Sequence, residues 1–297
     1  MIRIPPVMRC LLAASLALGL ALPAAAAARK AKVPAPLTPA PVVAAERAFA
    51  ADGLALGIKQ SFLKHMADDA VVFQPDPVNA REAVSAQSDK PGPKLEWWPI
   101  WAGISASGDL GFTTGPYALD GTRRGHYFTI WKKQADGGWK WLYDGGPSSS
   151  AKDAPGPGGT PGYLMVATTS AGDEATAFAS AQAADEALNT AAAEDLVPAY
   201  LAVLVCEARV QGSPAPPAQG CSSFREELAG RGRKVTFKPL GGSASSGGDL
   251  AWTYGDADWT IAGKAFRGHY VRVWQYRTDA WKLVFDQILP APPRKKG

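Results

Sequence analysis

The strongest constraint on the fold of this 297-residue chain is an internal repeat. Gly125–Trp131 (GHYFTIW) returns as Gly268–Trp274 (GHYVRVW). Four further pairs of similar segments precede these two in the same order, at offsets between 139 and 144 residues. The pairs are 44–49 with 183–188, 81–82 with 225–226, 94–99 with 234–239, and 108–110 with 248–250. Conserved order of this kind indicates a duplicated domain.

Each copy of the repeat predicts helices followed by strands. Ala-rich segments at 42–56 and 172–193 predict long helices, and shorter amphipathic helices are expected at 57–66 and 196–206. Strands are expected at 109–117, 126–133 and 139–144, with equivalents in the second copy. Helices first and an antiparallel meander afterwards predict an α+β fold. A Pro/Gly/Ser-rich linker over 148–170 separates the predicted domains, 42–147 and 171–290.

Three features of the sequence together resemble the NTF2-like superfamily, in particular its SnoaL-like and DUF4440-type members. They are Phe49 in the helical start, the turn and strand at 68–73, and the closing G-H-Y-x-x-x-W…W-K-x-x-x-D hairpin. The resemblance implies two tandem NTF2-like domains, each a curved antiparallel sheet wrapped around helices as a cone with an apolar pocket. It also implies an intramolecular pseudo-dimer, because NTF2-like domains often pair through their sheets. Some members are isomerases or dehydratases and others only bind ligands, so the resemblance does not select an activity.

The first 28 residues predict a secretory signal peptide. Arg3 and Arg9 supply the positive region, residues 11–22 are an apolar run, and small residues follow Pro23. The expected location is therefore periplasmic or secreted. No other stretch approaches 18 apolar residues, so no integral membrane segment is expected once the signal is removed.

Charge and cysteine content exclude several classes of function. The two chain ends hold eight of the 31 basic residues, so 23 basic residues face 27 acidic ones in between, and nucleic-acid binding is disfavoured. Outside the signal peptide the cysteines are Cys206 and Cys221, which either form a disulfide or stay free. No metal site is expected, because the three histidines are far apart in sequence and no Cys-x-x-Cys occurs. No motif predicts a cofactor.

The candidate catalytic residues are His126, Asp144 and His65. Period-two alternation places His126 on one strand face with Phe128 and Ile130, a face that suits the inside of a cavity. Asp144 ends the neighbouring strand, where a carboxylate beside His126 would raise the pKa of its imidazole. The alternative is a structural hydrogen bond that sets the strand register. His65 either faces the cavity or lies at the surface.

The candidate ligand-binding residues are aromatic: Trp97, Trp98, Trp101, Tyr117 and Phe128. Together they would line a pocket for a flat apolar molecule, or they are ordinary core. The matching positions of the second copy hold smaller or polar residues, so its pocket is expected to be smaller or closed. The sequence thus favours binding of a small apolar or aromatic molecule in the first domain, without chemistry. The alternatives are a lyase or isomerase with a His–Asp pair and a structural module of the cell envelope.

Overall fold

The structure, a computed structural model, describes residues 37–90 and 92–294. The predicted signal peptide, residues 1–28, lies outside the described residues. Within the described ranges, no helix is both long and apolar enough to cross a membrane. From Leu37 onward the chain forms one compact unit that contains both halves of the repeat.

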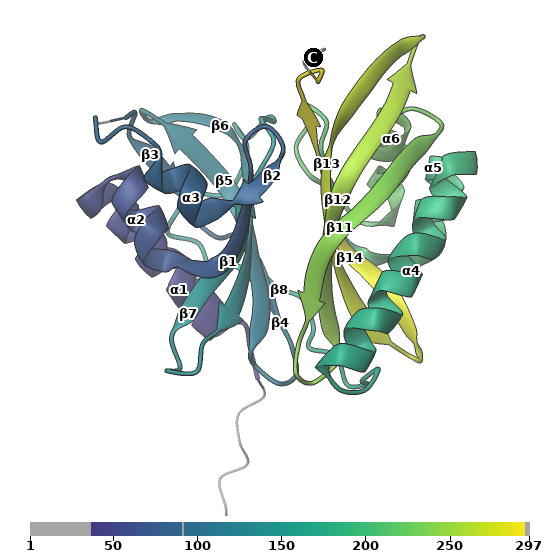
Figure 1. Ribbon diagram of the computed structural model, residues 1–297, viewed down its shortest axis with the longest axis horizontal. Helices are drawn as coiled ribbons and strands as arrows, with labels where there is room; N and C mark the ends of the chain where they lie inside the picture. Colours follow the sequence, from purple (N-terminus) through teal and green to yellow (C-terminus); the bar gives the residue numbers. More distant parts are fainter. Residues whose placement is uncertain (1–36, 91, 295–297) are drawn as a thin grey trace, which may run out of the picture. The chain divides into compact units, whose positions relative to one another are not determined.

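The first half is an eight-stranded sheet with three helices on one face (Figure 1). Its strands run in the order β2-β1-β7-β6-β5-β4-β8, and β3 pairs with β5. The elements are α1 (Ala40–Leu56), α2 (Ile58–His65), β1 (Met66–Phe73), β2 (Pro77–Asn79), α3 (Ala80–Ser85), β3 (Leu95–Trp97), β4 (Trp101–Ile104), β5 (Leu110–Leu119), β6 (Thr122–Lys133), β7 (Trp139–Gly145) and β8 (Gly162–Tyr163).

The second half repeats this topology in a six-stranded sheet of order β10-β9-β14-β13-β12-β11. Its elements are α4 (Glu174–Glu194), α5 (Leu196–Val203), β9 (Leu204–Gln211), β10 (Ala218–Gln219), α6 (Cys221–Ala229), β11 (Val235–Ala244), β12 (Leu250–Ile261), β13 (Lys264–Arg277) and β14 (Ala280–Ala291). Strand for strand, β9 to β14 take the places of β1, β2, β4, β5, β6 and β7. The duplication and the α+β fold class are therefore confirmed, and each half has the helix-on-curved-sheet arrangement of an NTF2-like fold.

Local sequence explains the hairpins that build both sheets. β5 and β6 join through Asp120 and Gly121, which both have positive φ (49° and 75°), and β12 and β13 join through Ala262 and Gly263 with nearly the same angles (49° and 78°). Two positive-φ residues define the type I′ turn, whose twist matches that of the flanking strands. Equivalent turns thus occur at equivalent places of the repeat.

The predicted helix over 196–206 is too long. The helix α5 ends at Val203, and the residues after it form β9, which pairs in parallel with β14. Cys206 therefore lies on a strand, and it forms a disulfide with Cys221 at the start of α6. Pairing of a strand with a distant strand overrides the local helical pattern here.

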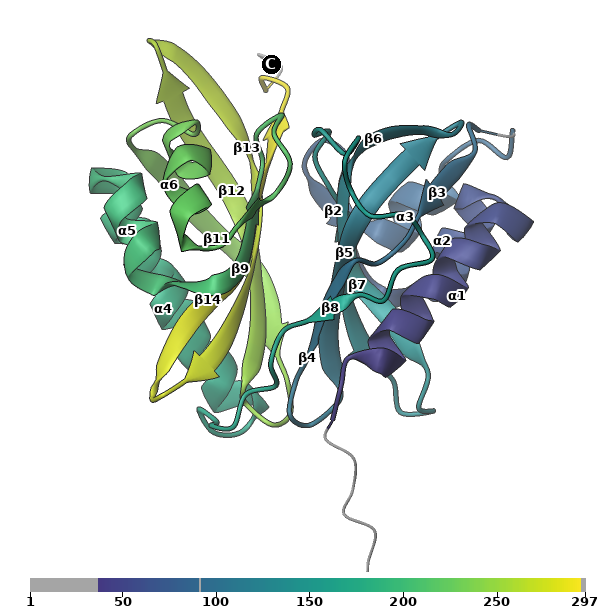
Figure 2. The ribbon, with the colours of Figure 1, turned by 180° about the vertical axis from the view of Figure 1, so that it is seen from behind.

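The two sheets meet through the faces that carry no helices (Figures 1 and 2). At their contact the rings of Phe128 and Phe285 are stacked, with centroids 3.5 Å apart. Buried polar groups also connect the sheets, since Gln287 donates to the hydroxyl of Tyr143 at 2.8 Å. Each sheet is therefore covered by helices on one face and in part by the other sheet on its second face.

A reciprocal contact joins two equivalent loops of the halves. Asp249 accepts a hydrogen bond from the backbone N–H of Ala106 at 2.8 Å, and Asp109 accepts one from the N–H of Ser246 at 2.9 Å. Asp109 and Asp249 are equivalent residues of the repeat, and Ala106 and Ser246 are equivalent too. An exchange of the same bond in both directions is what a two-fold axis produces.

The segment between the halves packs on the first half. Arg123 donates to the carbonyls of Ala151 and Lys152, and β8 pairs with β4. The boundaries 42–147, 148–170 and 171–290 stay predictions, because the compact unit shows no break at them.

Candidate functional site

The interior of the first half lies between its sheet and its helices. The face of β6 that lines this interior is opposite to the face predicted from the sequence. Trp131 donates through its indole Nε1 to Glu46 of α1 at 2.9 Å, so the odd-numbered side chains of β6 face the helices. His126, Phe128 and Ile130 face the second sheet instead. The predicted orientation is wrong because alternation separates two faces without saying which one the helices cover.

A buried carboxylate lies at the centre of this interior. Glu46 is 0% exposed and accepts hydrogen bonds from the indoles of Trp97 at 2.6 Å and Trp131 at 2.9 Å, and from the hydroxyl of Thr113. Burial raises the pKa of Glu46 despite these donors. Glu46 is not among the residues that the sequence singled out. A signal was present in the repeat, because Asp185 is its equivalent, is also buried, and accepts a hydrogen bond from Thr253, the equivalent of Thr113.

Asp144 is the second acid of this interior. The register places it opposite Thr129, whose hydroxyl donates to its Oδ2 at 2.7 Å. Burial, and then the nearby charge of Glu46, raise the pKa of Asp144 to about 7. At neutral pH this half-buried carboxyl therefore exists in both protonation states. A group that transfers protons needs both states near the working pH.

Asp144 lines a pocket of about 150 Å³ that opens between the sheet and α2. Its lining residues are Phe62, Leu95, Trp97, Tyr117, Tyr127, Asp144, Gly145 and Gly146. Among the described residues the buried hydroxyl of Tyr127 has no hydrogen-bond partner. Buried hydroxyls without a partner are uncommon, and Tyr127 is one of the residues that line this pocket.

The expected pair of His126 and Asp144 is not formed, because the two side chains lie on opposite faces of the sheet. His126 Nδ1 is 2.9 Å from the hydroxyl of Ser149, and burial lowers the pKa of His126 to about 4. That direction is the opposite of the expected one, since no carboxylate contributes to it. A β-bulge between Ile130 and Trp131 shifts the register, and Thr129 rather than His126 faces Asp144.

The equivalent residues of the second half are also apart. His269 pairs in register with Leu289, and Asp286 with Arg272. His269 Nδ1 lies 3.0 Å from the carboxylate of Asp256 instead. In both halves, therefore, this histidine and this aspartate have different partners and do not contact each other.

His65 lies between α1 and α2 and does not line the pocket. Its Nε2 is 2.6 Å from the Asp52 carboxylate, and its ring packs 5.2 Å from that of Phe49. Burial lowers the pKa of His65 more than Asp52 raises it. Its position is that of a half-buried helix contact.

The five aromatic candidates do not form one cluster. Trp97 and Tyr117 line the pocket beside Asp144. Trp98 donates to the carbonyl of Pro155 at 2.9 Å, Trp101 packs on Phe112 in the other face of the sheet, and Phe128 is stacked on Phe285. The reason lies at residues 98–100, where the chain breaks into β3 and β4. The pairing of these strands with β5 shifts by one residue there, which turns later side chains to the opposite face.

Arg272 fills the corresponding interior of the second half. It is 0% exposed and takes the place of Thr129 in the repeat. Its guanidinium donates to Asp185 at 2.8 Å, to Asn189 at 2.7 Å and to the hydroxyl of Tyr200 at 2.6 Å. Asp286 completes this set at 3.2 Å. The space that forms a pocket in the first half is occupied here by a paired charge.

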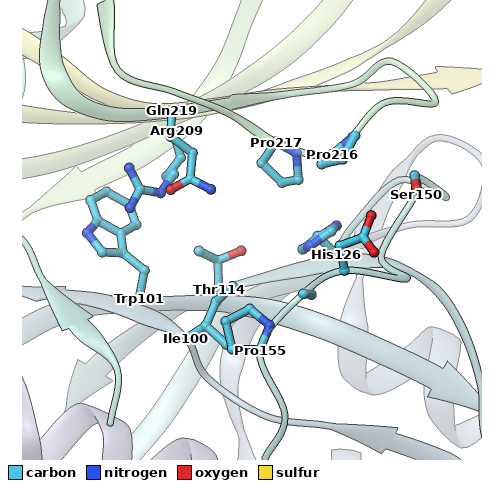
Figure 3. A pocket seen from close by; sticks show the side chains of 12 residues that line it. Ile100, Trp101, Thr114, His126, Ser150, Pro155, Arg209, Pro216, Pro217 and Gln219 are labelled. Atoms are coloured by element: carbon cyan, nitrogen blue, oxygen red, sulfur yellow. The ribbon is translucent and has the colours of Figure 1, made fainter. Parts of the chain in front are cut away.

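His126 and Trp101 line another pocket, also of about 150 Å³, between the two sheets (Figure 3). Arg209 and Gln219 contribute to it from the second half. Within residues 37–90 and 92–294, no group of three or more His, Cys, Asp or Glu side chains is placed to hold a metal ion.

Comparisons with known proteins find similarity in solved structures alone. No protein-family model matches the chain. No curated protein matches it either. Similar solved structures include an NTF2-like protein of unknown function from Pseudomonas putida KT2440, with 12% identity, a TM-score of 0.35, and coverage of 42% of this chain and 93% of that one. Another is a ketosteroid isomerase-like protein from Erwinia carotovora atroseptica SCRI1043, with 18% identity, a TM-score of 0.34, and coverage of 39% and 97%. At such low identities and TM-scores, the fold assignment depends on the chain's own helices and strands.

Proposed function

We propose that this protein is an exported binding protein whose first half holds a small apolar or aromatic molecule in the pocket beside Asp144. The observation that carries the proposal is the contrast between equivalent interiors. Thr129 leaves an open pocket in the first half, whereas Arg272 occupies the same place in the second. Export is proposed from the signal-like residues 1–28.

The size of the pocket limits the ligand. A cavity of about 150 Å³ engineered into another protein holds one benzene molecule. The pocket beside Asp144 has a similar volume and aromatic walls from Trp97 and Tyr117. The ligand is therefore a compound with about one ring, and larger substituents would extend into solvent.

The polar wall selects the ligand's functional group. When protonated, Asp144 donates a hydrogen bond, and when ionised it accepts one. With a pKa of about 7 it serves either a carbonyl or a hydroxyl near neutral pH. We therefore propose a small ring that carries one oxygen.

The direct test is a titration with cyclohexanone and with phenol, followed by calorimetry or by ligand-observed NMR. Replacement of the half-buried pocket residue Leu95 by Trp fills the pocket and should abolish binding. The matched control is Leu240→Trp in the second half, where Leu240 is 44% exposed, and it should bind as the wild type does. Binding that survives Leu95→Trp, or no binding of either compound, would reject the proposal. The latter result would favour a structural module of the cell envelope.

The raised pKa of Asp144 favours proton transfer as a second candidate function, of the isomerase or lyase type. Asp144 would act as the base without His126, which faces the other sheet. The carboxylate would take a proton from the carbon next to a ligand carbonyl and return it to the same or another atom. Exchange of the α-hydrogens of cyclohexanone in D₂O, followed by NMR, reports this step. If the wild type accelerates this exchange and Asp144→Asn does not, the protein is an enzyme. Equal exchange rates with both proteins support a protein that only binds its ligand.

The contacts between the sheets support an intramolecular pseudo-dimer. We propose that the reciprocal bonds of Asp109 and Asp249 are the remnant of a symmetric dimer that gene duplication joined into one chain. In such an arrangement one half can diverge to a closed core while the other keeps its pocket.

A further inference from the structure

The pocket between the sheets is built differently from the pocket beside Asp144. Figure 3 shows it enclosed by Ile100 of the first half, by Pro155 of the segment between the halves, and by Pro216 and Pro217 of the second half. Its volume is about 150 Å³, and its exposed wall is mostly apolar. Arg209 of β9 brings a positive charge into this apolar wall (Figure 3).

Arg209 has no carboxylate partner within the part of the chain that the structure describes. Its Nη1 donates to the backbone carbonyls of Glu207 and Ala208 at 3.2 and 3.3 Å. The acid nearest to it in sequence, Glu207, pairs with Arg277 instead. Burial alone lowers the pKa of the half-buried Arg209, and no neighbouring acid opposes that effect.

An unpaired, partly desolvated guanidinium is costly unless an anion completes it. The planar fork of arginine matches a carboxylate, to which it can donate two parallel hydrogen bonds. The guanidinium is also held in place, because it lies 4.8 Å from the ring centroid of Trp101. These contacts restrain its direction, and the side chain of Gln219 lies beside it (Figure 3).

The remaining polar groups of the pocket favour an anion with an apolar body. The hydroxyl of Thr114 is engaged by the carbonyl of Tyr127. His126 is neutral near pH 7, since burial lowers its pKa to about 4. Asp153 is the acid that lines the pocket, and its side chain is 84% exposed, so its charge lies at the rim and is only partly screened by water.

We propose that this pocket is a second ligand site, which binds a small monocarboxylate with a compact apolar or aromatic body. The carboxylate pairs with Arg209, and the apolar body lies between Ile100, Pro155 and the two prolines of the second half. The site is independent of the pocket beside Asp144, and it needs both halves of the repeat. Its volume again limits the body of the ligand to about one ring.

Calorimetric titration of the full chain with benzoate tests the proposal, with benzamide as the neutral analogue of the same shape. We expect benzoate to bind at least tenfold more tightly than benzamide. Arg209→Gln should weaken benzoate at least tenfold, whereas Arg233→Gln, which removes an exposed arginine paired with Asp195, should leave its affinity unchanged. Equal affinities for benzoate and benzamide, or an Arg209→Gln protein that binds benzoate like the wild type, would overturn the proposal.

Two further variants keep the test decisive if Arg209→Gln fails to fold. Asp153→Asn changes one exposed side chain and should strengthen benzoate binding severalfold, because it removes the negative charge at the rim. An unchanged or weaker affinity would count against the site. Asp144→Asn should leave benzoate affinity unchanged, and a loss there would place benzoate in the other pocket and overturn the proposal.

Discussion

At the scale of single residues, the two acids under the first sheet set the properties of the site. Glu46 is enclosed by donors, whereas Asp144 has one donor, Thr129, and reaches the pocket wall. Burial raises the pKa of both carboxyls, to about 7 for Asp144. Their surroundings rather than their residue type thus distinguish them, because Glu46 is enclosed by its donors and Asp144 lines a pocket.

Asp144 should make the stability of the protein depend on pH. Its pKa is about 7 when folded, against about 4 in an unfolded chain. A raised pKa means that the folded state binds the proton more tightly, so its contribution is fully present below pH 4 and is lost as the pH rises to 7. Asp144→Asn should therefore match the wild type at pH 4.5 and exceed it by about 2–4 kcal/mol at pH 8.5. Urea unfolding at both pH values measures the difference, and an Asn variant with no advantage at pH 8.5 would argue against the raised pKa.

Glu46 should be needed for folding rather than for ligand binding. Glu46→Leu leaves the indoles of Trp97 and Trp131 and the hydroxyl of Thr113 without their acceptor, at a cost of about 3–5 kcal/mol. Glu46→Gln keeps one acceptor oxygen and should cost about half as much. Urea unfolding of both variants checks this order, and equal stability of the Leu variant and the wild type would contradict it.

At the scale of elements, the sequence predicts the helices and strands that follow from local periodicity. It does not predict the features that depend on contacts between distant segments. The helices at 42–56 and 172–193 and the strands of the closing hairpin follow from local periodicity, and the structure has them within a few residues. The orientation of β6 and the pairing of His126 depend on which sheet face the helices cover and on one-residue shifts in register. The shift at 98–100 lies at Pro99, a residue type that interrupts strand pairing, although proline alone does not give the size of the shift. Residues 130–131 carry no such signal for their bulge.

The closed interior of the second half yields a prediction about β13. Arg272 is paired with Asp185 and Asp286 and is fully buried. Arg272→Thr leaves the buried carboxylate of Asp185 without its cation, while Asp286 keeps Arg231. The free energy of unfolding should fall by about 3–5 kcal/mol. Arg277→Thr on the same strand, which removes a partly exposed ion pair with Glu207, should cost less than about 1 kcal/mol. Thermal or urea unfolding compares the two, and a similar small loss for both would contradict the buried role of Arg272.

At the scale of the whole molecule, the two halves act as one unit. Their sheets share an apolar contact at Phe128 and Phe285, and their loops exchange the bonds of Asp109 and Asp249. The repeat itself was evident in the sequence. The pocket at Arg209 was not, because a site between two domains has no signature within either of them.

Cleavage of the connecting segment tests this unity. A protease site placed at Gly156–Gly159, where the chain is exposed, should allow a cut that leaves both halves associated during size-exclusion chromatography. The buried contacts across the sheets hold them together, so the cut protein should run as one peak of the uncut size. Separation into two stable monomers would contradict the pseudo-dimer.

The central claim is that the first half contains a ligand pocket beside Asp144 and that Arg272 closes the matching space in the second half. A crystal structure of the protein soaked with cyclohexanone measures this directly. We expect electron density for the ring between Trp97 and Tyr117 with its oxygen at Asp144, and none around Arg272. An empty first pocket at saturating cyclohexanone, or density around Arg272, would show that the ligand site is not where we place it.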